Sequence, residues 1–203
     1  MLLYYFPGTI SIAVAIALHE AGLPFETARV DFSNAEQTKA DYHAINPKGR
    51  VPALKTDHGI LTETGAILDY IAALAPGAGL VPADPFQAAR MREVMYYLAS
   101  TAHVNHAHKM RGARWASQET SFADMKAKVP ETMTASAAYL EGCLTGPFVL
   151  GDGVSLADCY LFVVASWMPG DKVDLSAFPK LTAFLAAMEQ RPSVQAVRAA
   201  GML

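Results

Sequence analysis

The N-terminal part of the chain alternates short apolar runs with one long apolar stretch. Leu2–Phe6 is apolar and aromatic and ends at Pro7-Gly8, which predicts a buried strand followed by a turn. Residues 11–20 are apolar on nearly every side and are followed by Gly22, a pattern typical of a buried helix. Phe25–Val30 then alternates like a strand. Together these elements predict a βαβ unit with parallel strands.

Two further short strands and a helix follow a polar stretch. Ala53–Lys55 and Ile60–Thr62 flank His58-Gly59, which predicts a β-hairpin. At Ala66–Ile71 the spacing of apolar residues changes from about every second residue to about every 3.6 residues, which predicts the start of a helix. We therefore expect residues 1–76 to form one α/β domain of order βαβαββα.

The rest of the chain has a helical pattern. Residues 77–86 are rich in proline, glycine and alanine, as a linker is. We expect residues 87–203 to form an all-α domain, with a proline kink in its second helix. The predicted helices are Phe86–Arg111, Ser121–Leu144, Leu156–Met168, Leu175–Glu189 and a short one after Arg191-Pro192-Ser193. The fold class is thus α/β followed by all-α.

Composition excludes several functional classes. Charged residues make up 17% of the chain, against about 25% in an ordinary soluble protein, and a buried subunit interface would explain the difference. The net charge of -3, without a basic cluster, argues against nucleic acid as a partner. No apolar run is long enough to span a membrane, and no leader pattern precedes the first strand, so we expect a cytoplasmic protein. Cys143 and Cys159 suggest neither a disulfide framework nor a thiolate zinc site.

Three features of the first domain suggest a site for an anionic, extended ligand. Thr9 and Ser11 lie where a strand gives way to a buried helix, so hydroxyl and backbone N–H groups converge there; the alternative is a plain helix cap. Val51-Pro52 would leave a backbone free to pair with a ligand if the proline is cis, whereas a trans turn is the alternative. Glu63-Thr64 opens a helix and offers either a carboxylate site or a cap.

The order of elements and several motifs resemble the cytosolic glutathione transferases, and among them the bacterial beta class. The Asn-Pro-x-Gly-x-Val-Pro element, followed at this spacing by Glu-Thr-x-Ala-Ile, is highly specific, and the resemblance covers the whole chain. Ser155-Leu156-Ala157-Asp158 resembles the family's capping box, which we interpret as folding chemistry. The other similar segments are Leu3–Gly8, Ala44–Leu54, Leu61–Ile67 and Arg191–Val194.

The resemblance implies a thioredoxin-like first domain that binds glutathione as co-substrate, a helical domain that supplies the electrophile pocket, and a homodimer without a metal. By the same resemblance, the backbone of Val51, beside a cis Pro52, pairs with the cysteinyl part of glutathione. Glu63 and Thr64 hold the γ-glutamyl end, and Lys48 contacts the glycyl carboxylate.

One position departs from the beta class. That class has a cysteine where this chain has Ile10, so the resemblance no longer implies thiol–disulfide or reductase activity. We expect Ser11 to be the principal group that stabilises the glutathione thiolate, with Thr9 as a second hydroxyl. Tyr5, at the same end of the strand, is the alternative donor.

The predicted helical domain contributes histidines and large apolar side chains. His103 and His106 share a helix face but His108 does not, so we expect no three-ligand zinc site on this helix. His103 matches a histidine that the beta class has near the glutathione sulfur; a plain helix histidine is the alternative. Met110, Trp115 and Trp167 are candidates for the electrophile pocket, with core packing the alternative for Trp167.

These features favour an enzyme that conjugates the glutathione thiolate to small hydrophobic electrophiles. A glutathione-dependent isomerase, ether lyase or dehalogenase would use the same thiolate. A non-catalytic binding scaffold is the alternative from another class, although it has no need of glutathione contacts.

Overall fold

The computed structural model describes residues 1–203. The chain forms two compact units: the N-terminal unit comprises Met1–Pro82 and Glu189–Leu203, and the helical unit comprises Ala83–Met188. The predicted all-α domain of residues 87–203 therefore needs one correction, because its last residues belong to the N-terminal unit. None of the helices is both long and apolar enough to cross a bilayer.

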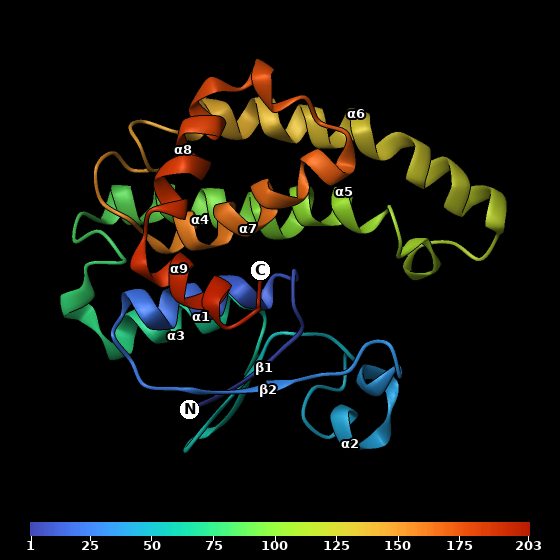
Figure 1. Ribbon diagram of the computed structural model, residues 1–203, viewed down its shortest axis with the longest axis horizontal. Coiled ribbons are helices and arrows are strands. Elements are labelled where there is room, and N and C mark those ends of the chain that lie inside the picture. The colour runs from blue at the N-terminus through green and yellow to red at the C-terminus, as the bar shows by residue number, and fades with distance from the viewer. The chain divides into compact units, whose positions relative to one another are not determined.

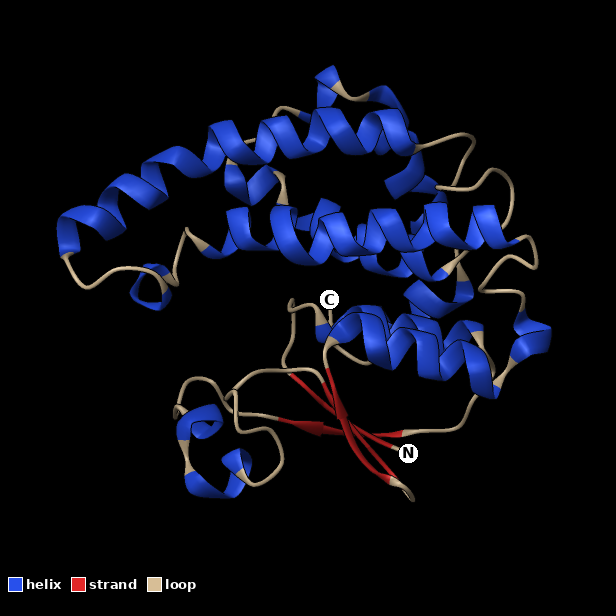
Figure 2. Cartoon of the chain, turned by 180° about the vertical axis from the view of Figure 1, so that it is seen from behind, coloured by secondary structure: helices blue, strands red, loops and turns tan.

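The N-terminal unit contains a four-stranded mixed sheet (Figure 2). Its strands are β1 (Leu2–Tyr5), β2 (Glu26–Arg29), β3 (Ala53–Thr56) and β4 (Gly59–Thr62), in the order β2-β1-β3-β4. β1 runs parallel to β2, and β3 is antiparallel to both β1 and β4. The predicted βαβ unit and hairpin are thus confirmed.

The same unit contains four helices, of which the first and the third contact the sheet. They are α1 (Ser11–Glu20), α2 (Ala40–His43), α3 (Thr64–Leu74) and α9 (Pro192–Ala199), with short 3-10 turns at Glu36–Thr38 and Pro76–Ala78. α1 contacts β1, α3 and α9 (Figure 1). Residues 11–18 are all buried, which explains why α1 is apolar on every side.

Polar contacts at the end of α1 hold the C-terminal segment in the N-terminal unit. Arg191 donates two hydrogen bonds to the Glu20 carboxylate, at 2.9 and 2.6 Å, and Ser193 Oγ donates a third at 2.6 Å. The backbone N–H of Gly8 donates to Met202 O at 2.9 Å. Between the contacts at Glu20 and the hydrogen bond at Gly8, α9 covers α1. No local pattern in the sequence signals this long-range packing, so the predicted domain boundary missed it.

We expect Glu20→Gln to destabilise the N-terminal unit. Burial alone would raise the pKa of Glu20, but the hydrogen bonds from Arg191 and Ser193 and the charge of Arg191 outweigh it and lower the pKa. Losing the carboxylate should cost about 1.5 to 3 kcal/mol of unfolding free energy at neutral pH. Because the folded pKa is lowered, this stabilisation is full above the ordinary pKa of 4.5 and is lost as the pH falls through the folded value.

Urea unfolding of both proteins at neutral and acidic pH measures this difference. The exposed Glu26→Gln is the control and should leave stability unchanged. A difference between wild type and Glu20→Gln that does not shrink in acid would contradict the assignment.

The helical unit contains α4 (Pro85–Tyr97), α5 (His103–Ala107), α6 (Glu119–Cys143), α7 (Leu156–Trp167) and α8, which runs from Pro179 to Glu189 at the unit's boundary. Short 3-10 turns occur at Gly112–Arg114, Pro169–Asp171 and Leu175–Ala177. α7 is the core of this unit: residues 156–165 are all buried, and the helix packs against α4.

Three predicted helix boundaries differ in the structure. The helix predicted over 86–111 is interrupted by a π-helical segment at Leu98–Ala102 and ends at Ala107. α6 begins at Glu119, runs through Pro130 and bends along its length (Figure 2). α8 begins only at Pro179, because a proline disfavours the helical conformation of the residue before it.

The capping box at the start of α7 is confirmed. Asp158 Oδ2 accepts from the Ser155 N–H at 2.8 Å and from Ser155 Oγ at 2.6 Å. Asp158 Oδ1 accepts from the Val149 N–H at 2.8 Å, so the same carboxylate also fixes the loop before the helix. Burial raises the pKa of Asp158 in spite of these bonds.

Candidate active site

The turn between β1 and α1 brings two hydroxyls together. Thr9 Oγ1 lies 2.7 Å from Ser11 Oγ and donates to Phe6 O at 2.7 Å. Ser11 Oγ accepts from the Phe6 N–H and lies within reach of Phe6 O, both at 3.3 Å. Ser11 is 0% exposed, whereas Thr9 is partly exposed. The two hydroxyls thus form one hydrogen-bonded cluster, with Thr9 as its accessible member.

This burial changes the expected role of Ser11. The Ser11 side chain is buried, like the other residues in the first two turns of α1. Ile10, the position of the beta-class cysteine, is only 4% exposed and precedes the helix. Of Thr9, Ile10 and Ser11, Thr9 is therefore the residue that keeps appreciable exposed surface. The side chain of Tyr5, also partly exposed, makes no hydrogen bond.

Two side-chain hydrogen bonds fix the loop before β3 at Arg50, the residue before Val51. Arg50 O accepts hydrogen bonds from Tyr42 Oη at 2.8 Å and from Asn46 Nδ2 at 2.6 Å. Gly49 has a positive φ of 61°, and a Cβ there would lie 2.8 Å from Gln37 O, so the turn requires glycine. Burial raises the pKa of Tyr42, which keeps its hydroxyl a donor.

Val51 itself presents an unpaired backbone. The Val51–Pro52 bond is cis, as the resemblance implies. Neither the N–H nor the C=O of Val51 has a hydrogen-bond partner within the protein. An edge of this kind can pair with an extended peptide.

The start of α3 combines a strained residue with a charged pair. Glu63 has a positive φ of 74° and precedes Thr64, the first residue of α3. Thr64 is 7% exposed and its hydroxyl makes no hydrogen bond in the structure. Lys48 Nζ lies 2.9 Å from Glu63 Oε1 and donates to Thr62 Oγ1. Lys48 thus lies beside Glu63, although the resemblance implies that these two residues contact opposite ends of glutathione. A strained backbone such as that of Glu63 is typical of ligand sites.

In the helical unit, two histidines pack on one tryptophan. The ring centroid of Trp167 lies 5.0 Å from that of His103 and 4.3 Å from that of His106, and the latter pair is stacked. His103 begins α5 directly after the π-helical segment. Such segments occur often at functional sites.

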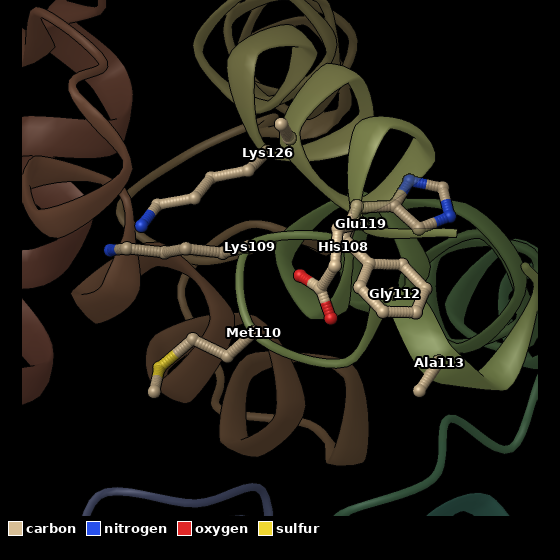
Figure 3. Close-up of a pocket in the computed structure, with 9 residues that line it drawn as sticks. His108, Lys109, Met110, Gly112, Ala113, Glu119 and Lys126 are labelled. Atoms are coloured by element: carbon tan, nitrogen blue, oxygen red, sulfur yellow. The ribbon is translucent and has the colours of Figure 1, made fainter. Parts of the chain in front are cut away.

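The other two predicted pocket residues do not join Trp167. Trp115 packs against His108 with ring centroids 4.5 Å apart. Met110 is 83% exposed and lines an open hollow of about 410 Å³ between the end of α5 and the start of α6. Figure 3 shows this hollow, with Lys109 and Lys126 extending to the same side.

One group near Trp167 was missed by the sequence reasoning. His106 Nδ1 lies 2.6 Å from Asp171 Oδ2, and Lys109 Nζ donates to Asp171 Oδ1 at 2.9 Å. The Asp171 side chain is 0% exposed. In the sequence His106 suggests only a zinc ligand, and Asp171 lies 65 residues away with no motif that connects the two residues. The structure contains no group of three His, Cys, Asp or Glu side chains that could hold a metal ion.

Both parts of the chain match family models. Residues 1–73 match the glutathione S-transferase N-terminal domain, and residues 105–200 match the glutathione S-transferase C-terminal domain. The chain is 32% identical to glutathione S-transferase GstA of Escherichia coli O157:H7, over 96% of each protein. Its relatives also include proteins named maleylacetoacetate isomerase and LigF.

Solved structures give the same result. A glutathione transferase homologue from Sulfitobacter, solved with bound glutathione, is 64% identical with a TM-score of 0.98, covering 100% of this chain and 98% of that one. The beta-class glutathione S-transferase of Sphingomonas chungbukensis is 34% identical with a TM-score of 0.85 and full coverage of both chains. The chain therefore belongs to the cytosolic glutathione S-transferase family and is similar along its whole length to the bacterial beta class.

Proposed function

We propose that this protein is a glutathione transferase that joins the thiolate of glutathione to small hydrophobic electrophiles, without a metal. The observation that carries the proposal is the unpaired backbone of Val51 beside the convergent Lys48, Glu63 and Thr64. An extended tripeptide with a charge at each end fits such an arrangement. The Sulfitobacter homologue with bound glutathione supports the same ligand.

Each end of glutathione has a group that can receive it. Val51 pairs with the cysteinyl backbone, and the unpartnered Thr64 hydroxyl at the start of α3 receives the γ-glutamyl carboxylate. The γ-glutamyl ammonium takes the place of Lys48 on the Glu63 carboxylate. Lys48, so released, can turn to the glycyl carboxylate. Binding thus exchanges one ion pair for two, while the γ-glutamyl carboxylate is held by the neutral Thr64 hydroxyl.

The Thr9 hydroxyl is the donor that stabilises the thiolate in this proposal. A thiol with a pKa of about 8.5 needs a shift of roughly two units, or about 2.7 kcal/mol, to be mostly ionised at pH 7. A helix N-terminus supplies about 0.3 to 1 kcal/mol, and a hydrogen bond to a charged group about 1.5 to 3 kcal/mol. One hydroxyl and the start of α1 are therefore sufficient.

Ser11 allows Thr9 to act as a donor. In the unliganded turn Thr9 donates to Phe6 O. When Thr9 turns its proton toward the sulfur, Ser11 Oγ can donate to Phe6 O in its place, since it lies 3.3 Å away. Phe6 O then keeps a partner in both states. Ser11 acts as a positioning residue, while Tyr5 is the second choice of donor.

The remaining parts of the proposal come from the family. We propose that Trp167 and His103 line the electrophile side, that the protein is a homodimer, and that it acts in the cytoplasm. Some relatives are named maleylacetoacetate isomerase or LigF. The second candidate function is therefore a glutathione-dependent reaction on a dedicated metabolic substrate.

We expect the double variant Glu63→Gln/Thr64→Ala to bind glutathione at least tenfold more weakly. Losing a hydrogen bond to a charged group costs about 1.5 to 3 kcal/mol, and both changes remove a partner of the same end of the ligand. Calorimetric titration measures the affinity. The chain offers a matched control in Glu26→Gln/Thr27→Ala, the same residue pair on exposed β2, which should bind as wild type does. Unchanged affinity in the first variant would refute this binding mode.

A further inference from the structure

The peptide of Phe6 connects β1 to the hydroxyl cluster of Thr9 and Ser11. The Phe6 C=O accepts from Thr9 Oγ1 at 2.7 Å and from the Thr9 N–H at 3.3 Å, and the Phe6 N–H donates to Ser11 Oγ at 3.3 Å. Phe6 follows the last residue of β1, so neither group takes part in the pairing of the strands. The direction of the Thr9 hydroxyl therefore depends on how the Phe6 peptide is held.

The ring of Phe6 is held by an aromatic contact with Phe32, in the loop after β2. The two rings are stacked, with centroids 4.4 Å apart and an interplanar angle of 3°. The guanidinium carbon of Arg29, at the end of β2, lies 5.6 Å from the centroid of the Phe6 ring, within the range of a cation–π contact. The side chain of Phe6 is thus held by β2 and by the loop that follows it.

Hydrogen bonds within this loop fix the backbone on either side of Phe32. The Asp31 carboxylate accepts from the N–H groups of Ser33 and Asn34, at 2.9 and 3.3 Å, and from the side chains of both residues. The Asp31 N–H donates to Glu36 Oε2 at 2.6 Å. The hydrogen bonds from Ser33 and Asn34 lower the pKa of Asp31 to about 2, so this carboxylate stays ionised at the pH of an enzyme assay.

We propose that Phe32 is a positioning residue for the thiolate of glutathione and acts through Phe6 and Thr9. This inference rests on the proposed function, in which Thr9 turns its proton to the sulfur while Ser11 replaces Thr9 as the donor to Phe6 O. The exchange requires Phe6 O to stay within reach of both hydroxyls, at 2.7 Å from Thr9 Oγ1 and 3.3 Å from Ser11 Oγ. The stacked rings keep Phe6 O in this position.

Phe32→Ala should raise the thiol pKa of bound glutathione by about 0.5 to 1 unit, because the Thr9 hydrogen bond is weakened. Thiolate absorbance recorded against pH measures this shift. At neutral pH kcat/KM for chlorodinitrobenzene should fall about three- to tenfold with the fraction of thiolate. The loss should shrink above the thiol pKa, where both proteins hold the thiolate. Glutathione affinity below the thiol pKa should change less than about threefold.

Two further variants isolate the contribution of the stacked ring. Phe32→Tyr keeps the ring and should titrate as wild type does. Phe25→Ala removes a phenylalanine from the other end of β2, where Phe25 packs against His19 with centroids 5.1 Å apart, and should leave the thiol pKa unchanged. Circular dichroism verifies the fold of each variant. Should Phe32→Ala unfold, Asp31→Ala keeps the ring but opens the loop, and should raise the thiol pKa in the same way.

A double variant shows whether Phe32 acts through Thr9. Adding Phe32→Ala to Thr9→Val should raise the thiol pKa no further, since the hydroxyl that Phe32 positions is then absent. An unchanged thiol pKa in Phe32→Ala, or the same rise with and without Thr9, would overturn the inference. A higher KM for chlorodinitrobenzene without a shift of the thiol pKa would overturn it too, because Phe32 would then contact the electrophile.

These outcomes are distinct from those that test the proposed function. If wild type binds glutathione and Thr9→Val shifts the thiol pKa while Phe32→Ala does not, only the role of Phe32 fails. If Thr9→Val leaves the thiol pKa unchanged, the choice of Thr9 as donor fails, and the role of Phe32 fails with it. If wild type does not bind glutathione, the transferase proposal itself is refuted.

Discussion

Thr9→Val should lower kcat/KM for chlorodinitrobenzene by about 10- to 100-fold, the equivalent of losing one hydrogen bond to a charged group. Valine keeps the shape of threonine but removes the hydroxyl of Thr9, which, unlike Ser11, is a partly exposed residue of the β1–α1 turn. Because the lost interaction forms with the thiolate and not with the thiol, glutathione affinity below the thiol pKa should change less than about threefold.

The titration of bound glutathione provides a direct measurement. Thiolate absorbance recorded against pH should show a higher thiol pKa in Thr9→Val than in wild type. Ser11→Ala should raise the thiol pKa by a smaller amount, since Ser11 acts through Thr9. It should also destabilise the fold, because the Phe6 N–H loses the Ser11 Oγ acceptor. If the thiol pKa is unchanged in both variants, the hydroxyl cluster is not the donor, and Tyr5 is tested next.

Asp158→Ala should be the most destabilising single change in the helical unit, at about 3 to 4 kcal/mol. The Asp158 carboxylate accepts three hydrogen bonds in the interior, from two backbone N–H groups and one hydroxyl. Removal leaves the Val149 N–H and both Ser155 donors without a partner where water cannot replace it. Burial raises the pKa of Asp158, so relief of that desolvation offsets part of the loss.

Urea unfolding monitored by circular dichroism gives the free energy. Asp124→Ala, on the exposed side of α6, removes the same side chain from the same unit and should cost less than about 0.5 kcal/mol. A loss below about 1 kcal/mol for Asp158→Ala would mean that the capping box contributes little to this fold.

The sequence predicted those features that depend on neighbouring residues. Proline and glycine mark the ends of β1 and α1, and the spacing of Ser155 and Asp158 alone identifies the cap of α7. Glu63 and Thr64 were placed at a helix start because the apolar period changes there. In each case the physical cause lies within a few residues of its effect.

Features that depend on distant packing could not be predicted in this way. Ser11 is a sensible candidate by position, but its burial depends on which side of α1 faces the core, and a helix apolar on all sides gives no such signal. The dyad of His106 and Asp171 joins two helices that share no motif. The π-helical segment before His103 also has no signature in the apolar pattern.

The return of residues 189–203 to the N-terminal unit has a consequence for biosynthesis. During translation the sheet, α1 and α3 leave the ribosome long before α9, so the apolar surface of α1 that α9 covers stays open while the helical unit is being made. The bonds from Arg191 and Ser193 to Glu20 can form only when that last stretch emerges. The N-terminal unit, although it is encoded first, is therefore the later of the two to be completed, and until then the apolar face of α1 that α9 covers is open to aggregation.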